Sequence, residues 1–406
     1  MCKGSIMGQK VVITGLGVVS SLGKGKNLFW KNLLAGKTGI SKVTSFDTSA
    51  YFTSYAGEIK DFNARENIKD KNMKDIGRTS QFLIAAVEGA LKNAGIDEEF
   101  LRNKKCGIML GTASGEAQAV EKNNKQWIKQ GLKSIKKKNI KDYTTNILAY
   151  NLTKALEIKG IIKIFRTACA AGNYAIAHGY DLIRQGEVDI VIAAGADSFS
   201  EVMFAGFNQV GAVAPCKCQP FDKNRKGMIP AEGAGVLILE SLSHAKKRKA
   251  QIYAEVLGAG FSCDAFHMTA PSSEGIARCL INSLSVARIK STAVDYICAH
   301  GTGTISNDRA ESMAIKQVFG KKIPVSSIKS HLGHSMGAAS MIEAVACCLS
   351  LQQGIMPATI NYETPDPECD IDCVPNYPRE KKLKVIINNS FAFGGNNAAV
   401  VLGQYL

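Results

Sequence analysis

The chain has 406 residues, of which 46% are hydrophobic and 7% aromatic, the composition of a globular protein with a substantial core. Its 50 basic and 35 acidic residues give a formal charge of +15, which suits a polyanion, an acidic protein partner or no function beyond solubility. The longest apolar stretches, such as residues 188–196, fall short of the roughly 18 residues that a membrane span needs, so a soluble protein is expected. The lysine runs at 133–141 and 246–249 lack interleaved aromatic residues, and we therefore expect no nucleic-acid binding.

The first half of the chain alternates between predicted strands and helices. Residues 11–14 predict a buried strand that ends in a tight turn at Gly15 and Gly17, and residues 26–34 predict a helix. Apolar residues have helical spacing over 76–94, where Gly95 ends the pattern. Further strands are expected at 106–110, 161–165, 188–194 and 236–239, with a lysine-rich helical region at 116–158 and a helix at 174–183.

The second half repeats this alternation. Strands are predicted at 252–257, 294–299, 325–327 and 384–387, and helices at 275–288, 309–319 and 338–351. The strands at 107–112 and 296–302 both run into Gly-Thr, which hints at a duplication. Strands that are apolar on both faces and alternate with helices predict an α/β fold in which helices cover both sides of the sheets.

Most of the 12 cysteines are expected to be packing residues, because free cysteine is commonly buried. This group comprises Cys263, Cys279, Cys298, Cys347 and Cys348. The pairs Cys216/Cys218 and Cys369/Cys373 do not match a zinc-binding pattern, so no structural metal is expected. No secretory segment is recognisable before the first strand, which favours a reducing, cytoplasmic compartment without disulfides.

Cys169 differs from the other cysteines because it lies where a β-branched stretch ends and an amphipathic helix begins. Small residues flank it on both sides and would let a substrate reach the sulfur. The free N–H groups of a helix start are expected to favour the thiolate.

Three further polar residues lie where predicted strands end. His300 follows the strand at 294–299 and enters a Gly-Thr-Gly-Thr loop. Lys329 and His334 lie in the turn between the strand at 325–327 and the helix that follows. Because chemistry concentrates at such edges, these three residues and Cys169 form the candidate site.

Four motifs, which follow one another along the chain, resemble those of a known protein family. They are Thr-Ala-Cys-Ala-Ala-Gly at 167–172, Ala-His-Gly-Thr-Gly-Thr at 299–304, Val-Ser-Ser-Ile-Lys at 325–329 with Gly-His-Ser-Met-Gly-Ala-Ala at 333–339, and Asn-Ser-Phe-Ala-Phe-Gly-Gly-Asn at 389–396. Through these motifs the chain resembles an elongating type II β-ketoacyl-acyl carrier protein synthase of the thiolase superfamily. The similarity extends from residue 11 to residue 402.

The resemblance implies a thiolase-like fold of two similar βαβαβ halves packed as five α-β-α-β-α layers. Residues 1–250 would carry the nucleophilic cysteine, and residues 251–406 the His/His/Lys residues. It further implies an acyltransferase of fatty-acid or polyketide synthesis that works with acyl- and malonyl-loaded acyl carrier protein, as a homodimer or as a heterodimer with a related subunit. No cofactor and no metal are expected.

The resemblance also assigns roles to individual residues. Cys169 would hold the acyl group, and His300 and His334 would stabilise the enolate formed by decarboxylation of malonyl. The backbone N–H groups of Cys169 and Phe393 would form the oxyanion hole of acylation. The remaining expected site residues are the gate residue Phe391, the supporting residues Asp308, Glu311, Gly394 and Gly395, and the acyl-pocket residues Ser114 and Phe207.

We expect Lys329 to tune the electrostatics of the site and not to act as a base. A buried lysine needs a partner, and Glu311 is the expected one. Ser114 stands where many type II enzymes carry a bulkier aliphatic residue, which suggests an altered or longer acyl pocket.

Three other interpretations remain to be compared. A non-catalytic chain-length factor typically lacks the cysteine, and degradative thiolases and priming synthases usually replace the second histidine. The remaining alternative is a ketosynthase subunit of a specialised polyketide or unusual-lipid pathway that acts with such a factor, favoured by the sequences around 229–231 and 396–397.

The candidates for docking the acidic carrier protein are Lys71, Lys74 and the lysine run at 133–141.

Overall fold

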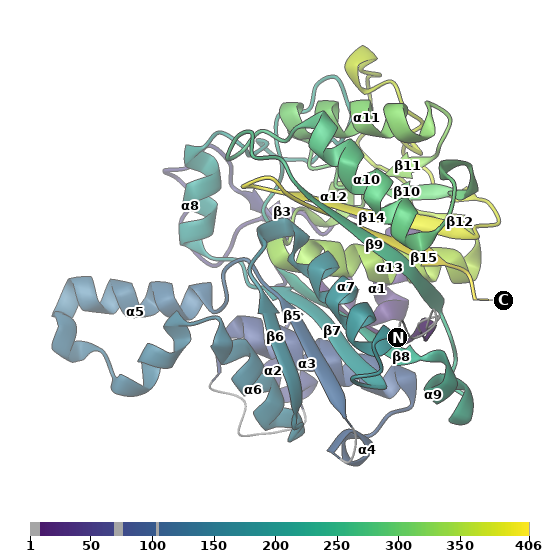
Figure 1. Ribbon diagram of the computed structural model, residues 1–406. Helices are drawn as coiled ribbons and strands as arrows, with labels where there is room; N and C mark the ends of the chain where they lie inside the picture. The colour runs from purple at the N-terminus through teal and green to yellow at the C-terminus, as the bar shows by residue number, and fades with distance from the viewer. Residues whose placement is uncertain (1–8, 69–75, 103–104, 406) are drawn as a thin grey trace.

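The protein is built around one mixed sheet, seen in a computed structural model that describes residues 9–68, 76–102 and 105–405 (Figure 1). Eleven strands join in this sheet, ten of them in the order β11-β10-β14-β15-β9-β1-β8-β7-β5-β6. Their bounds in the first half are β1 Val11–Ser20, β2 Gly23–Lys24, β5 Cys106–Gly111, β6 Gly160–Phe165, β7 Ile190–Asp197 and β8 Gly233–Ser241. In the second half they are β9 Ala254–Cys263, β10 Tyr296–Cys298, β11 Val325–Ser326, β14 Val385–Ala392 and β15 Asn396–Gly403.

The two halves of the sheet have the same topology. From the centre outwards the strands run β1, β8, β7, β5, β6 in one half and β9, β15, β14, β10, β11 in the other. Leaving the small strands aside, each half therefore places its first strand beside its last and its second strand beside its third. The hint of duplication came from β5 and β10, which occupy equivalent positions. The halves join where Val11–Ile13 of β1 pair with residues 254–256 of β9.

Helices cover both faces of each half-sheet. They are α1 Lys26–Leu34, α2 Ala64–Asn67, α3 Arg78–Ala94, α4 Glu98–Arg102, α5 Ala117–Gln130, α6 Asn146–Leu156, α7 Ala171–Arg184, α8 Glu201–Gln209, α9 Leu242–Lys247, α10 Ser273–Ala287, α11 Ile305–Phe319, α12 Lys329–Leu332 and α13 Ala339–Gln353. Helix α3 packs on the outer face of the first half and α10 on that of the second, with α7 and α13 between the halves (Figure 1). The expected five-layered α/β fold is confirmed.

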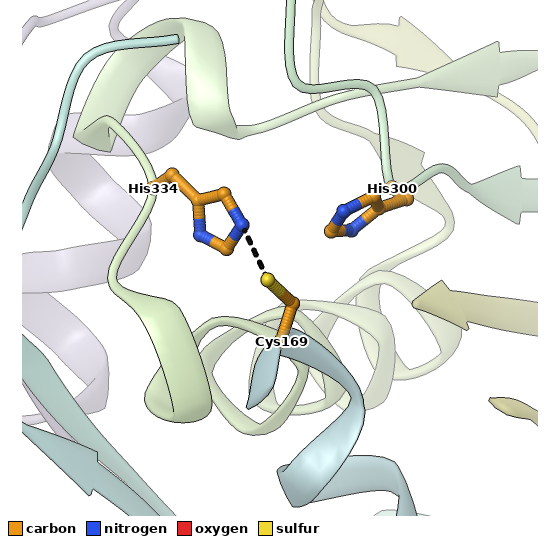
Figure 2. Close-up of side chains that lie close together, drawn as sticks. All are labelled: Cys169, His300 and His334. Carbon is orange, nitrogen blue, oxygen red and sulfur yellow. Dashed lines mark hydrogen bonds between the residues drawn. The ribbon is translucent and has the colours of Figure 1, made fainter. Parts of the chain in front are cut away.

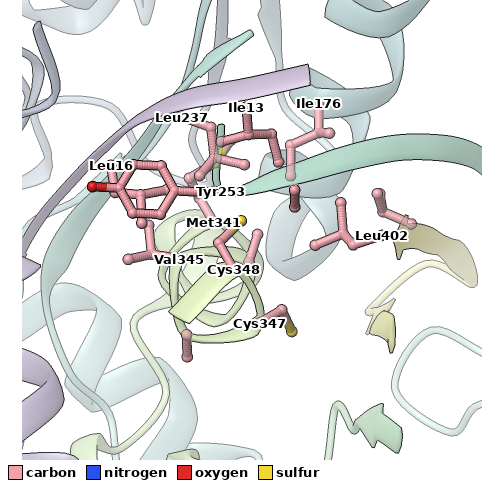
Figure 3. Packing of buried hydrophobic residues seen from close by; sticks show 14 of the residues in the cluster. Ile13, Leu16, Ile176, Leu237, Tyr253, Met341, Val345, Cys347, Cys348 and Leu402 are labelled. Carbon is pink, nitrogen blue, oxygen red and sulfur yellow. The ribbon is translucent and has the colours of Figure 1, made fainter. Parts of the chain in front are cut away.

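Helix α13 forms the centre of the core. Residues 339–351 of this helix are all buried, so other parts of the protein surround it on every side. Figure 3 shows Met341 and Val345 of α13 packing near Ile13 of β1, Leu237 of β8 and Leu402 of β15. One helix thus contacts strands of both half-sheets, which holds the two halves together.

The expected turn at Gly15 and Gly17 is wrong, because β1 continues through both glycines to Ser20. Their function is close packing: a Cβ on Gly17 would lie 2.0 Å from the carbonyl oxygen of Ala86, and one on Gly15 would lie 2.5 Å from that of Ala90. Both carbonyls belong to α3, so the glycines let the helix approach the strand.

Most other predicted elements occur within a few residues of their expected bounds, and Gly95 ends α3 in the left-handed conformation, at φ 66°. Strand β15 was not predicted. The small strands are β3 Ser41–Lys42, β4 Tyr55–Ala56, β12 Ile355–Met356 and β13 Arg379–Glu380. Cys279, Cys298, Cys347 and Cys348 are buried as expected, whereas Cys263 is exposed. No described helix is both long and apolar enough to cross a membrane.

Candidate active site

Cys169 lies in a short elbow between β6 and α7. A 3-10 turn at Ala168–Ala170 runs directly into α7, and Ala168 adopts a positive φ of 47°. The hydroxyls of Ser340 and Ser390 donate to the carbonyl oxygen of Cys169 at 3.1 and 2.8 Å. The elbow is therefore held from α13 and from β14, and it presents the sulfur to the space between the two halves.

His300 is held through its backbone. It follows β10, and the buried carboxylate of Glu311 accepts hydrogen bonds from His300 N–H (2.9 Å) and Gly301 N–H (2.8 Å). Asp308 accepts from Gly303 N–H at 3.2 Å, and both glycines have positive φ, at 36° and 81°. The two acidic residues expected as supporting residues thus shape the loop that carries His300.

His334 contacts Cys169 directly (Figure 2). Its Nε2 lies 3.1 Å from the sulfur of Cys169, and its Nδ1 accepts a hydrogen bond from Met336 N–H at 3.1 Å. Because a backbone N–H can only donate, Nδ1 is unprotonated and the ring proton of neutral His334 lies on Nε2. His334 therefore donates toward the sulfur and toward any oxygen bound beside it.

The two imidazoles face a common space next to the sulfur. Their ring centroids are 5.3 Å apart at 83°, and both rings are buried. Burial, together with the charge of Lys329, holds the pKa of each histidine well below its usual range. Both rings are consequently neutral near pH 7, each with one N–H to offer. Within the described residues His300 Nδ1 has no hydrogen-bond partner, so the protein does not fix which nitrogen carries its proton.

Lys329 is fully buried and forms an ion pair with Glu343 of α13, and not with Glu311 as expected from the sequence. Glu311 is engaged by the backbone of the His300 loop and by the amide of Asn389 at 3.2 Å. Burial alone would lower the pKa of Lys329, but the Glu343 carboxylate reverses this and the net shift is upward. Lys329 therefore remains a cation near the sulfur.

The thiol of Cys169 does not have the lowered pKa that its place at a helix start suggested. Burial raises the pKa of Cys169 to about 12, and the nearby Lys329 ammonium opposes this rise only in part. The effect of desolvation on the sulfur outweighs the effect of the helix N–H groups, so Cys169 is a thiol near pH 7.

A cavity of about 260 Å³ opens over the sulfur, lined by Cys169, His300 and His334. Phe207, Phe391 and Phe393 also line it, and the rings of Phe207 and Phe393 are 6.2 Å apart. Phe393 is 38% exposed and is followed by Gly394 and Gly395, both with positive φ, whereas Phe391 is buried. The aromatic residues expected to form the gate and the acyl pocket thus line the same cavity as Cys169.

Ser114 is not among the residues that line this cavity, in contrast to its expected role; its neighbour Ala113 lines the wall. The Ser114 hydroxyl instead donates to Asp197 at 2.8 Å. The sequence reasoning missed Glu343, Asp197 and the methionines Met203, Met228 and Met336 of the lining. A buried lysine signals that a carboxylate is near, but only the packing of α13 shows which one.

Cys169, His300 and His334 also resemble a metal-ligand set, since their ligand atoms lie within 4.8 Å of one another. A metal would need an unprotonated Nε2 on His334. The Met336 N–H occupies Nδ1 and leaves the proton on Nε2, and the charge of Lys329 also opposes a cation. The geometry suits acyl transfer better than metal binding.

Comparison with known proteins agrees with this geometry. The beta-ketoacyl synthase N-terminal domain model matches residues 8–245 and the beta-ketoacyl synthase C-terminal domain model matches residues 253–363. The chain belongs to the beta-ketoacyl synthase family. It is accordingly a condensing enzyme of the acyltransferase class.

Similarity to individual proteins extends over nearly the whole chain. The 3-oxoacyl-[acyl-carrier-protein] synthase 2 of Coxiella burnetii is 38% identical, covering 98% of this chain and 99% of its own. The solved ishigamide ketosynthase/chain length factor is 41% identical, with a TM-score of 0.96 and coverage of 98% and 100%. A type II polyketide ketosynthase solved with its acyl carrier protein is 32% identical, with a TM-score of 0.92 and the same coverage.

Proposed function

We propose that this protein is a β-ketoacyl-acyl carrier protein synthase that extends an acyl chain by two carbons through decarboxylative Claisen condensation. The observation that carries the proposal is the sulfur of Cys169 in an apolar cavity, 3.1 Å from a protonated Nε2 of His334 and faced by His300. The sulfur can hold an acyl group while two neutral imidazoles stabilise an adjacent oxyanion.

In the first step Cys169 takes the acyl group from a carrier thioester. The sulfur–acyl bond forms, the carrier sulfur–acyl bond breaks, and the thiol proton of Cys169 passes to the departing carrier thiolate. Because one thioester replaces another, the exchange is nearly isoenergetic and consumes no net proton. Lys329 stabilises negative charge on the attacking sulfur, and the N–H groups of Cys169 and Phe393 are the proposed oxyanion hole.

In the second step, after the carrier thiol of the first step has left, a malonyl thioester enters the cavity. It loses CO₂, and the enolate oxygen accepts hydrogen bonds from His300 and His334. The enolate carbon then attacks the acyl carbonyl, forming a carbon–carbon bond and breaking the bond to Cys169, whose thiolate takes a proton from water to become a thiol again. Because the protein leaves His300 Nδ1 without a partner among the described residues, the substrate oxygen can set the tautomer of that ring.

The carrier protein is the proposed donor of both substrates. The net charge of +15 would attract an acidic carrier through long-range steering. The candidate docking run at 133–141 lies on the segment after α5 that projects from the body (Figure 1). Lys71 and Lys74 lie outside the described residues.

Intact-protein mass spectrometry tests the proposal directly. The protein is incubated with carrier-bound acyl groups of graded length, and an adduct of the acyl mass is expected on Cys169 for at least one length. Cys169→Ala should show none, and Cys216→Ala, which removes an exposed cysteine, should behave as the unmodified protein. Absence of an adduct with every chain length would rule out the enzyme function proposed here.

A second function is supported by the likeness to the ishigamide ketosynthase/chain length factor: a ketosynthase subunit that pairs with a related, non-catalytic chain-length factor. Edge strand β6 is largely exposed, including Ile161 and Ile162, and the projecting segment around the end of α5 exposes Trp127, Ile128 and Leu132. An open edge with apolar neighbours suits pairing with another chain of the same fold. We propose that a second subunit, identical or related, covers β6.

We further propose a cytoplasmic location. The described cysteines are all free, as a reducing compartment requires. Fractionation of cells that make the tagged chain would test this, and recovery outside the cytoplasm would contradict it.

A further inference from the structure

Asp197, the last residue of β7, carries a fully buried carboxylate that only hydrogen-bond donors surround among its described partners. Its Oδ1 accepts from Thr112 Oγ1 (2.8 Å), Ser114 N–H (2.9 Å) and Ser114 Oγ (2.8 Å). Its Oδ2 accepts from Ala113 N–H (2.8 Å) and Gly337 N–H (2.7 Å). Five donors on one carboxylate fix two separate loops to the end of β7.

The hydrogen bond from Gly337 N–H connects Asp197 to the turn that contains His334 and Met336. Gly337 directly follows Met336, whose N–H occupies Nδ1 of His334. Met336 has a positive φ of 52°, a conformation that a residue with a side chain holds only when its surroundings impose it. The hydrogen bond from Gly337 N–H to Asp197 constrains the backbone one residue after Met336 and so helps to hold this conformation.

Close packing at Gly337 reinforces this arrangement. A Cβ on Gly337 would lie 2.6 Å from the N atom of Ala113 and 2.6 Å from Oδ2 of Asp197. The turn therefore rests directly on Asp197 and on the loop of Ala113, which lines the acyl cavity. Movement of the carboxylate would move both the turn and the cavity wall.

We propose that Asp197 is a positioning residue for His334. Its carboxylate holds Gly337, and through it Met336, so that Met336 N–H stays on Nδ1 and the ring proton stays on Nε2, directed at Cys169. This inference rests on the proposed function only for the role of His334 as a donor to the enolate. The tautomer itself is a property of the free protein.

The first test is the tautomer of His334, read from ring nitrogen NMR shifts of protein labelled with ¹⁵N-histidine and assigned with His334→Ala. The unmodified protein should show the Nε2–H form. Asp197→Ala removes all five acceptor contacts and should give a mixture with the Nδ1–H form. Retention of a pure Nε2–H form in Asp197→Ala would overturn the proposal.

A matched control separates positioning from general destabilisation. Glu116 is another buried carboxylate that accepts from two backbone N–H groups, those of Thr79 and Ser80, at the start of α3. Glu116→Ala should lower thermal stability without changing the His334 tautomer. The same tautomer mixture in Glu116→Ala would show that the effect is not specific to Asp197.

The second test compares the two half-reactions. In Asp197→Ala the release of CO₂ from malonyl-carrier substrate should fall about 100-fold, as expected for a misplaced catalytic group, whereas acylation of Cys169 should fall far less. If Asp197→Ala does not fold, Gly337→Ala disturbs the same contact from the other side and should give the same split. Equal losses in both half-reactions would contradict positioning. A changed tautomer together with a fully active His334→Ala would instead refute the proposed role of His334.

Discussion

At the scale of single residues, the site combines neutral hydrogen-bond donors with one buried cation. Among the described side chains, the charge of Lys329 favours the ionised form of the sulfur, while burial and the carboxylates of Asp197 and Glu343 oppose it. The imidazoles remain neutral because burial and Lys329 act in the same direction on them. The charge of Lys329 therefore acts on the protonation of the sulfur and of both imidazoles, and we expect it to influence both half-reactions.

Lys329→Ala should slow both acylation of Cys169 and malonyl decarboxylation, each by about tenfold or more, since one unit of pKa corresponds to a tenfold change. The variant removes the cation and leaves Glu343 buried without its partner. The two rates are measured separately, by adduct formation and by CO₂ release. Glu343→Gln is the companion variant, because it removes the partner and keeps Lys329. Rates near those of the unmodified protein in Lys329→Ala would show that the cation is not needed.

The pH dependence of Cys169 reactivity follows from its raised pKa. Because the pKa of the thiol is about 12, the thiolate fraction should grow by about tenfold per pH unit from pH 7 to 10, without the plateau near 8.5 of an ordinary thiol. The check is the rate of iodoacetamide alkylation at Cys169, followed by peptide mass. Lys329→Ala should be slower at each pH, since it loses the charge that favours the thiolate. A plateau below pH 9 would contradict the prediction.

At the scale of elements, strands and helices approach one another closely where glycine allows it. The contact between β1 and α3 depends on Gly15 and Gly17, whose missing side chains make room for carbonyl groups of the helix. This contact covers the outer face of the first half-sheet. It is also the place where the expectation of a turn failed.

Gly17→Ala should lower the free energy of unfolding by about 1–3 kcal/mol or more, because its Cβ would lie 2.0 Å from the carbonyl oxygen of Ala86. Urea unfolding followed by circular dichroism measures the change. Gly89→Ala, on the exposed face of the same helix with nothing within 4 Å, is the control and should stabilise by about 0.4–1 kcal/mol. Equal and small effects of both substitutions would mean that the helix can move away from the strand.

At the scale of the whole molecule, two similar half-sheets place the reactive groups on either side of one cavity. Cys169 comes from the first half, and His300, Lys329 and His334 come from the second. Helix α13 lies between the halves and supplies both Glu343 and Ser340, so it connects the core to the site. The free edge at β6 leaves the first half open to a further subunit.

Light scattering should show a particle of about twice the 43.5 kDa chain mass if a second copy covers β6. Ile162→Lys places a charge on this edge and should shift the population toward monomer. Tyr377→Lys, which changes an exposed aromatic residue in the second half, should not. A monomer at all concentrations would favour the second function, in which the partner is a different, related chain.

The sequence by itself determined the α/β class, most elements, and the candidate residues Cys169, His300 and His334, which the structure brings together, because apolar periodicity and the motifs around these residues are local. It also suggested the duplication through β5 and β10. The partner of Lys329, the contact of Ser114 with Asp197 and the role of Gly15 and Gly17 depended on the tertiary structure. Each of these is a contact between segments distant in the chain, and burial, which raises the pKa of Cys169, exists only after those segments have packed.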